Sequence, residues 1–331
     1  MRCSELIETV DTHTSGEPTR IILSGIPRLY GASVREMRDY FKEHYDYIRT
    51  RLTYEPRGHA GMLCAAVVPP CRPEADFGIF YFDDVQYLDM CGHATIGVGT
   101  ALAEIGLVPP EKRERYVLET PAGLVTIRNH YADGAVESTS IENVHSYVID
   151  PDMAITVDGV AVHVQVAYGG NVFAILPADP FGLKLVPECC GEMKRLSRLV
   201  RAACDERLAA NGLPETKITL VQWYHAPLGT GADTRCVHSS GHGSPDRSPG
   251  GTGTSAKLAV LHQQGRLKVG EPFAQESIVS GKFVGRILEV LEEDGHTVIV
   301  PEITGQARIT GFHKFVFDAR DPLVEGFFFA E

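Results

Sequence analysis

The sequence predicts a strand-rich α+β fold in two domains, on three observations. The chain has 331 residues, which is more than one compact core usually holds, so two domains of about 150 residues each are expected. Short apolar runs bounded by glycine, proline and aspartate outnumber the helical patterns, which favours α+β over a doubly wound α/β fold. A segment near residue 91 is also echoed near residue 250. We therefore expect two lobes of similar construction.

Individual strands and helices follow from local patterns. Two stretches, residues 33–45 and 194–211, have the apolar spacing of helices. No G-x-G-x-x-G turn follows a strand, so no phosphate cradle of that kind is predicted. Nine short runs have the composition of β-strands: residues 20–23, 64–68, 77–82, 116–118, 124–127, 160–166, 172–176, 218–223 and 287–290.

The internal echo joins two segments that lie 159 positions apart. CGHATIGVGTALAEIGL begins at Cys91, and GGTGTSAKLAVLHQQGR begins at Gly250. Each segment opens with small residues, continues as an apolar helical stripe and ends at a glycine suited to the position after a helix. Four pairs match at this offset: Gly92 and Gly251, Thr95 and Thr254, Leu102 and Leu261, Gly106 and Gly265. The echo predicts two duplicated lobes with a helix that begins at the same kind of site in each.

Composition and charge narrow the class of protein. No run approaches the roughly 20 apolar residues of a membrane span, so we expect a soluble protein without a membrane partner. Residues 1–12 lack the apolar core of a secretory signal, which predicts a cytoplasmic location. A net charge of −12 without a cluster of Lys and Arg argues against nucleic acid. We expect a small-molecule substrate. The protein partner that we allow for is a second copy of this chain, in a homodimer.

Cysteine usage points to one position. Without a secretory signal the eight cysteines are expected to be reduced. Cys91 directly precedes a Gly-rich helix start, where backbone N–H groups and the helix dipole favour a thiolate and make the thiol a usable base. By itself Cys91 is equally explained as a small buried residue. The other seven have no C-x-x-C partner and no metal-ligand spacing and are expected to be inert: Cys3, Cys64, Cys71, Cys189, Cys190, Cys204 and Cys236.

Six motifs extend this reasoning along nearly the whole chain. They are HTSGEPTR (residues 13–20), EPRGHAGM (55–62), ADFGIFYFD (75–83), DMCGHAT (89–95), GGNVFAI (169–175) and DRSPGGTGTSA (246–256). Together they resemble the proline racemase family. The resemblance implies two pseudo-symmetric lobes similar to diaminopimelate epimerase, each a curved sheet or barrel around a central helix, with the substrate between the two helix N-termini. It implies no metal, nucleotide or pyridoxal phosphate. We expect residues 1–150 with 315–331 to form the first lobe and 151–314 the second.

The resemblance also implies roles for individual residues. Cys91 is the acid/base thiol, Gly92, Gly251 and Thr252 present backbone N–H groups to the substrate carboxylate, and His93 and Asp246 contact the ring nitrogen. His93 is otherwise explained as a locally satisfied helix-start residue, and Asp246 as a turn or N-cap residue.

Two positions depart from the racemases of that family. Racemases have a second cysteine on the opposite face of the substrate, where this chain has Gly250, and dehydratases have threonine there. Glycine cannot transfer a proton, and we expect its missing side chain to leave room for a water. Ser240 replaces a Phe that packs on proline, and its hydroxyl suits a hydroxylated ring. His242 is either a proton donor to a leaving hydroxide or a solvated loop residue.

These departures decide between reactions. Racemisation by two bases needs a proton-transfer group on each face of the substrate, whereas β-elimination from 3-hydroxyproline needs one base at Cα and a donor for the hydroxide. We therefore expect a cofactor-independent lyase, a trans-3-hydroxy-L-proline dehydratase, with Cys91 as the base. The alternatives are an isomerase, either proline racemase or 4-hydroxyproline 2-epimerase, and a non-catalytic imino-acid binder.

Overall fold

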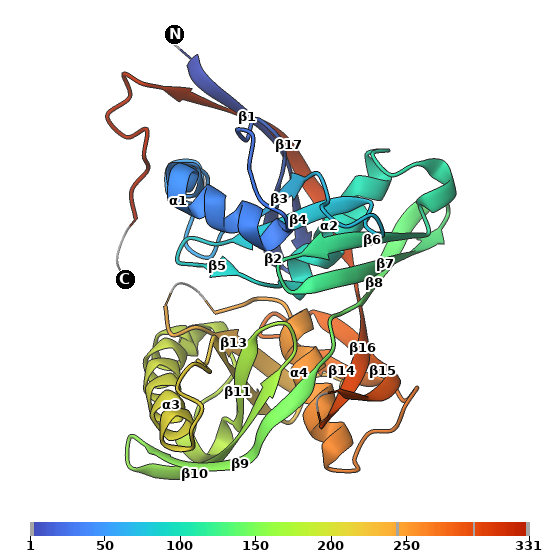
Figure 1. Cartoon of the computed structure of the whole chain (residues 1–331). Helices are drawn as coiled ribbons and strands as arrows, with labels where there is room; N and C mark the ends of the chain where they lie inside the picture. The colour runs from blue at the N-terminus through green and yellow to red at the C-terminus, as the bar shows by residue number, and fades with distance from the viewer. Residues whose placement is uncertain (1–2, 243–244, 294, 329–331) are drawn as a thin grey trace. The chain divides into compact units, whose positions relative to one another are not determined.

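The computed structural model describes residues 3–242, 245–293 and 295–328, which form two compact units (Figure 1). Unit 1 comprises Met1–Ile141 and Gln306–Glu331, and unit 2 comprises Glu142–Gly305. The boundaries expected from the sequence were residues 150 and 314. The chain instead returns to unit 1 at residue 306, because β17 (Ala307–Asp318) pairs antiparallel with β1 (Cys3–Thr14) along its length.

Unit 1 is a mixed sheet with two parallel crossovers. β2 and β3 are parallel across α1, and β4 and β6 are parallel across α2. The pairs β1/β2, β3/β4 and β6/β7 are antiparallel. In addition to β1 and β17, the elements are β2 (Glu17–Ser24), α1 (Val34–Thr53), β3 (Leu63–Val68), β4 (Phe77–Phe82), β5 (Tyr87–Leu88), α2 (Gly92–Glu104), a 3₁₀ turn (Pro110–Lys112), β6 (Arg115–Thr120), β7 (Gly123–Ala132) and β8 (Ala135–Glu142).

Unit 2 repeats this topology. β11 and β12 are parallel across α3, β13 and β14 are parallel across α4, and β10/β11, β12/β13 and β14/β15 are antiparallel. The echoed segments at Cys91 and Gly250 therefore begin the second crossover helix of each unit. The elements are β9 (Tyr147–Val157), β10 (Val160–Tyr168), β11 (Val172–Pro177), 3₁₀ turns (Asp179–Phe181, Pro187–Cys189), α3 (Cys190–Ala210), β12 (Leu220–His225), β13 (Thr234–Ser239), α4 (Gly251–Gln263), β14 (Phe273–Glu276), β15 (Lys282–Glu293) and β16 (His296–Gly305).

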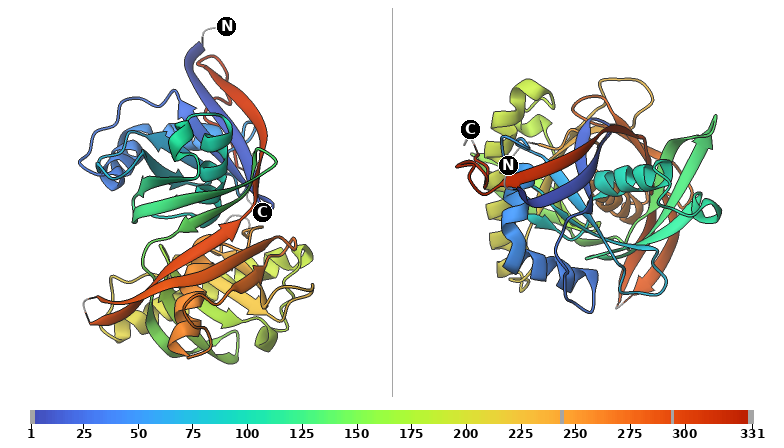
Figure 2. Two further views of the ribbon diagram at one scale, coloured as in Figure 1. Left: turned by 90° about the vertical axis from the view of Figure 1, so that its right-hand side faces the viewer. Right: turned by 90° about the horizontal axis from the view of Figure 1, so that it is seen from above.

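The helices α2 and α4 are each enclosed by the strands of their own unit. Every residue of α2 from Gly92 to Ala103 is buried, and so is every residue of α4 from Gly251 to Leu261. α2 contacts β1, β2, β3, β7 and β17, and α4 contacts β9, β10, β11, β15 and β16. The right-hand view of Figure 2 shows α2 beside β1 and β17. A helix buried all round needs small and apolar residues on every face, which both segments supply. The predicted α+β class, with a sheet around a central helix, is confirmed.

The helices α1 and α3 cover their sheets with one apolar stripe each. The helix predicted at residues 33–45 is longer, because non-helical backbone at Tyr45 only kinks α1 and the apolar residues Ile48 and Leu52 continue its buried stripe. Ser33 caps the helix by accepting a hydrogen bond from the backbone N–H of Glu36 (3.2 Å). The helix predicted at residues 194–211 is α3, whose buried residues include Met193, Leu196, Val200, Cys204 and Leu208.

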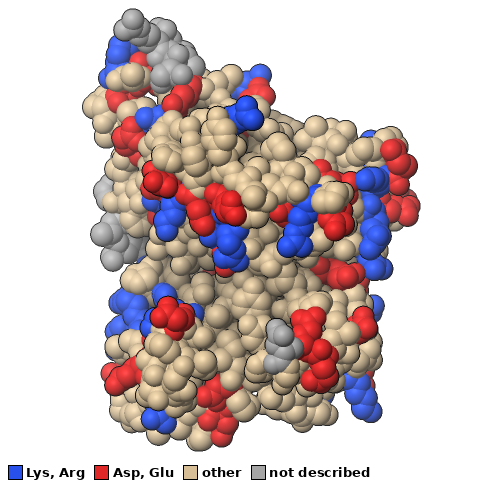
Figure 3. Space-filling view, in the orientation of Figure 1, with Lys and Arg blue, Asp and Glu red and all other residues tan. Residues whose placement is uncertain are grey.

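All nine predicted strand runs overlap strands of the structure. The strands that the sequence analysis did not predict are β1, β5, β8, β9, β13, β14, β16 and β17. Most of them mix charged and polar residues with apolar ones and so lack a simple apolar pattern, and β5 has only two residues. No described helix is long and apolar enough to cross a membrane. On the face shown in Figure 3, acidic and basic side chains are interspersed.

Candidate active site

Cys91 is the N-cap residue of α2, in extended backbone (φ −140°, ψ 107°), and its side chain caps none of the first backbone N–H groups of the helix. Its side chain is buried, with 6% of the residue exposed. The Sγ atom lies 3.4 Å from Nδ1 and 3.8 Å from Nε2 of His93, which is 5% exposed. A thiol beside an imidazole is an arrangement in which a proton can pass between sulfur and nitrogen. The structure therefore brings two of the predicted site residues together.

The backbone that carries this thiol–imidazole pair is held by hydroxyl groups. Thr95 Oγ1 donates to the carbonyl of Cys91 (2.6 Å) and also lies 2.8 Å from the hydroxyl of Tyr81. Thr14 Oγ1 donates to the carbonyl of His93 (2.9 Å). These residues are buried, so the hydrogen bonds are shielded from water and restrict the position of the thiol.

The loop before Cys91 is fixed by charge. Asp89, the first residue of the DMCGHAT motif, forms ion pairs with Arg35 (3.2 Å) and Arg38 of α1. Its carbonyl accepts a hydrogen bond from the backbone N–H of Ala122 (3.1 Å). The motif therefore ties the start of α2 to α1 and to the turn after β6.

Other described cysteines differ from Cys91 in their surroundings. Burial raises the pKa of the Cys64 and Cys204 thiols to about 12, and raises that of Cys236 further. The pKa of Cys71 is raised by burial and then by the charge of Glu119. Such thiols stay protonated near neutral pH. Within the described ranges, no group of three or more His, Cys, Asp or Glu is arranged to hold a metal ion.

The start of α4 in unit 2 corresponds to the start of α2. Gly250 is the N-cap residue, and Thr254 Oγ1 donates to its carbonyl (2.7 Å), as Thr95 does to that of Cys91. Gln275 Nε2 donates to Thr254 Oγ1 (2.7 Å), and Gln222 Nε2 donates to Gln275 Oε1 (2.9 Å). This buried polar chain holds the N-cap backbone. The echo of Thr95 and Thr254 thus has a physical meaning, because each fixes the residue that begins a central helix.

Gly250 differs from Cys91 in conformation and surroundings. Its φ of +69° and ψ of 108° lie where side chains are strained. A Cβ built on it would lie 2.4 Å from Cε1 and Nδ1 of His238, and a Cβ on Gly253 would lie 2.0 Å from Nε2 of the same ring. The prediction that the missing side chain leaves room for a water at this position is wrong, because the imidazole of His238 fills the space.

The remaining predicted residues of unit 2 are placed around this helix start. Gly251 and Thr252 are the first two residues of α4. The N-cap residue Gly250 makes no side-chain hydrogen bond to the start of the helix. Asp246 Oδ1 accepts from the backbone N–H of Ser248 (2.7 Å), which is the turn role considered for it. Contacts of these residues with a substrate remain predictions.

In the loop after β13, Ser240 forms hydrogen bonds with the backbone of His242. Ser240 Oγ donates to the carbonyl of His242 (2.7 Å) and accepts from the backbone N–H of His242 (3.1 Å). His242 is exposed as a residue, and the slight burial of its ring, followed by the charges of Arg201 and Arg198, lowers its pKa. His242 is therefore neutral near pH 7. The substrate roles of both residues remain predictions.

Sequence reasoning missed His238. His238 lies on β13, two residues after Cys236 and two before Ser240, the positions whose side chains alternate to the same side of an extended chain. It is 2% exposed. The sequence did contain one signal for it. A histidine stands on a strand shortly before Gly250, the position where the racemases of the family have a cysteine. Only the fold shows that the ring of His238 and the glycine share one space.

Comparisons with known proteins agree with the motifs. The sequence model of the family described as "Proline racemase" matches residues 9–328. A proline racemase from Clostridioides difficile is 42% identical over 332 residues, with 99% of each chain covered. A trans-3-hydroxy-L-proline dehydratase from Bacillus thuringiensis subsp. konkukian is 37% identical over 332 residues, again with 99% of each chain covered.

Among solved structures, a hydroxyproline epimerase from Agrobacterium vitis, with bound trans-4-hydroxy-L-proline, superposes with a TM-score of 0.89 at 28% identity. The match covers 99% of this chain and 97% of that one. The resemblance read from the six motifs is confirmed over the same length. The chain belongs to the proline racemase family.

Proposed function

We propose that this enzyme removes the α-proton of a proline-type imino acid with Cys91 and eliminates water from trans-3-hydroxy-L-proline. The observation that carries the proposal is the buried pair of Cys91 and His93 at the start of α2, with 3.4 Å between Sγ and Nδ1. Racemisation of proline and dehydration of 3-hydroxyproline both begin by breaking the Cα–H bond, so the thiol has the same first task in either reaction.

The stereochemistry of the substrate favours elimination by this pair. In trans-3-hydroxy-L-proline the hydroxyl is trans to the carboxylate, so the α-hydrogen and the hydroxyl lie on the same face of the ring. The base and the acid must then act from one side. Cys91 and His93 belong to the same helix start and supply both groups, a thiol and an imidazole.

The proposed steps balance. The Cys91 thiolate takes the α-proton, the electron pair forms the Cα–Cβ double bond, and the Cβ–O bond breaks. Protonated His93 gives its proton to the departing hydroxide, which leaves as water. The resulting enamine tautomerises to a cyclic imine. Transfer of the proton from Sγ to His93 restores the starting pair.

Other residues take the roles that the resemblance implies. Gly92, Gly251 and Thr252 are proposed to bind the carboxylate through their backbone N–H groups, and Asp246 to contact the ring nitrogen. Ser240 is proposed to meet the ring hydroxyl as an acceptor, because its own proton is donated to the carbonyl of His242. His93, which the resemblance assigns to the ring nitrogen, is proposed here as the partner of the thiol.

Proton NMR in deuterated water tests the proposal. The protein is incubated with trans-3-hydroxy-L-proline, and loss of the substrate signals with formation of the cyclic imine is followed. Cys91→Ser is expected to lower the rate by about 100-fold or more, because an alcohol is a poor acid/base group near neutral pH. Cys71→Ser, which changes a thiol of raised pKa elsewhere in unit 1, is the matched control and should retain the full rate.

Two results would contradict the proposal. A Cys91→Ser rate above about a tenth of the parent rate would show that Cys91 is not the base. Binding of L-proline without elimination from the 3-hydroxy acid and without exchange of any α-proton would identify a non-catalytic binder.

A further inference from the structure

We propose that the imidazole of His238 is a second proton-transfer group, and that with it the enzyme inverts Cα of proline or 4-hydroxyproline in addition to the elimination proposed above. This inference rests on proton removal by Cys91. It adds an activity that a chain with only one acid/base group could not perform efficiently.

The ring of His238 lies where a second catalytic side chain would begin. His238 fills the space where the side chain of residue 250 would begin, with its Cε1–Nδ1 edge beside Gly250 and its Nε2 beside Gly253. The motif resemblance places the second thiol of the racemases at position 250, on the substrate face opposite Cys91. In this chain an imidazole, which both accepts and delivers protons near neutral pH, occupies the space next to that position.

The ring of His238 is closely packed by its neighbours. Any side chain at Gly250 or Gly253 would collide with the ring, so an imidazole in this place requires glycine at both positions. Phe173 packs edge-to-face against the ring, with a centroid distance of 5.6 Å and an interplanar angle of 78°. A buried imidazole requires polar partners for its ring nitrogens, which an apolar side chain of similar size would not, so the histidine is better explained by its chemistry than by packing.

His238 is also linked to the proposed substrate-binding residues. The carbonyl of His238 accepts a hydrogen bond from the backbone N–H of Asp246 (2.9 Å). The ring lies beside the N-cap residue of α4, directly before Gly251 and Thr252. His238 is therefore held within the same short segment of unit 2 as the residues proposed to bind the ring nitrogen and the carboxylate.

The proton transfers balance without a co-reactant. The Cys91 thiolate takes the α-proton from the L-substrate, and protonated His238 delivers a proton to the opposite face of the carbanion. The product has inverted Cα, Cys91 is a thiol and His238 is neutral. Exchange of one proton each with solvent restores both groups, and the reverse reaction uses them in exchanged roles.

Inversion of L-proline and of trans-4-hydroxy-L-proline, followed by polarimetry and proton NMR in deuterated water, tests the inference. The parent should invert at least one of them. His238→Gln, which keeps a polar side chain of similar reach, should slow inversion by about 100-fold or more. Elimination from trans-3-hydroxy-L-proline and exchange of the α-proton by Cys91 should be slowed far less than inversion, because neither needs a group on the second face of the substrate. His225→Ala, on the neighbouring strand β12, is the control and should change neither.

A third variant keeps the test valid if the substitution perturbs packing. His238→Ala with Gly250→Cys removes the ring and places a thiol at residue 250, and it should recover inversion relative to His238→Ala alone. Circular dichroism confirms that each variant is folded.

The outcomes separate the two proposals. A parent that inverts neither acid, a His238→Gln variant that inverts as fast as the parent, or one that loses elimination and inversion alike would overturn the assignment of His238. Inversion that depends on His238 in a protein that never eliminates water would leave this inference standing and overturn the proposed lyase.

Discussion

Substitution of Gly250 by cysteine should destabilise the protein because of His238. At φ +69° and ψ 108° a side chain adds backbone strain of about 1–3 kcal/mol. A Cβ 2.4 Å from the ring of His238 adds overpacking of about 1–3 kcal/mol, because the ring is 2% exposed and backed by Phe173. Together these effects cost about 4 kcal/mol, a large share of a typical stability of about 5–15 kcal/mol.

Removing the ring should reverse part of this loss. In a His238→Ala background only the backbone strain remains, so Gly250→Cys should cost about 2 kcal/mol less there than in the parent. Gly265→Cys is the matched control, because Gly265 has the same φ of +69° and a Cβ on it would meet no atom within 4 Å. It should show the backbone cost alone in both backgrounds.

Urea unfolding followed by tryptophan fluorescence measures these differences. Trp223 is the single tryptophan of the chain and is buried in the core of unit 2, so its signal reports the unit that carries the substitutions. The reasoning is refuted if Gly250→Cys destabilises the parent and the His238→Ala variant equally, within about 0.5 kcal/mol.

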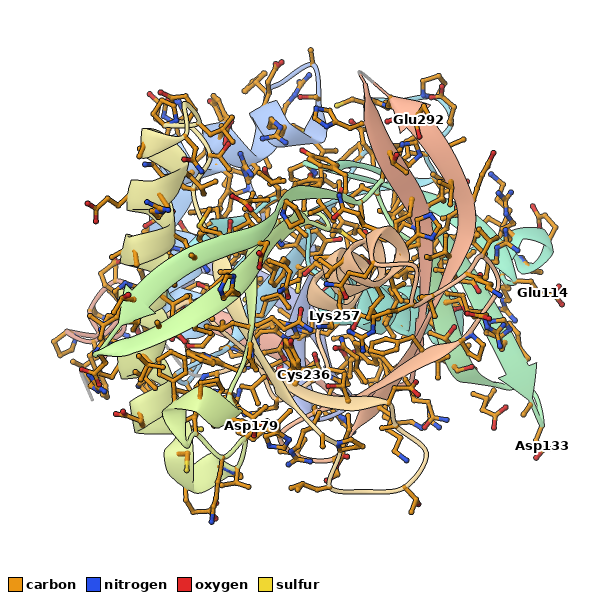
Figure 4. The ribbon with its side chains drawn as sticks, turned by 90° about the horizontal axis from the view of Figure 1, so that it is seen from below. Glu114, Asp133, Asp179, Cys236, Lys257 and Glu292 are labelled. Atoms are coloured by element: carbon orange, nitrogen blue, oxygen red, sulfur yellow. The ribbon has the colours of Figure 1, made fainter. Side chains whose placement is uncertain are left out.

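Three further predictions concern the interior of both units. Lys257 of α4 is 4% exposed, and its Nζ lies 3.6 Å from the centre of the Tyr224 ring. Burial, followed by the charge of Arg266, lowers the pKa of Lys257 to about 8, and Cys236 opposes this shift (Lys257 and Cys236 are labelled in Figure 4). Because the unfolded chain holds this proton up to about pH 10.5, the free energy of unfolding should rise with pH between about 8 and 10.5. In urea titrations the rise should be about 3 kcal/mol larger for the parent than for Lys257→Met, and a difference between the two proteins that stays constant with pH would refute the assignment. Thr95→Val should cost about 1–3 kcal/mol and lower kcat more than it raises KM. Thr100→Val, on the same helix, breaks a 2.8 Å contact with Thr139 of β8 and should cost stability alone, and equal kinetic effects of the two variants would exclude a positioning role for Thr95. Iodoacetamide at pH 7.5 should inactivate the enzyme in step with alkylation of Cys91, detected by mass spectrometry, while Cys64 and Cys204 stay unmodified; inactivation before Cys91 reacts would point to another thiol.

Several features of this protein were readable from the sequence because they depend on local patterns. Strand runs such as residues 77–82 and the helix start after Cys91 are visible in apolar periodicity and in the position of glycine. The echo between Cys91 and Gly250 predicted a helix start at the same place in two lobes, and the structure shows one topology in both units. Polar strands such as β1 and β17 were missed, because their pairing depends on partners about 300 positions away.

Contacts across the fold were decided by tertiary structure alone. The sequence singled out Cys91, but not that His93 lies 3.4 Å from its sulfur or that Thr95 holds its carbonyl. It marked Gly250 as a lost side chain, but not that His238, twelve residues earlier on β13, fills the space. A local pattern reports what one segment can form by itself. Which side chains share a space depends on how the strand and helix pack, and that is determined only when the whole unit folds.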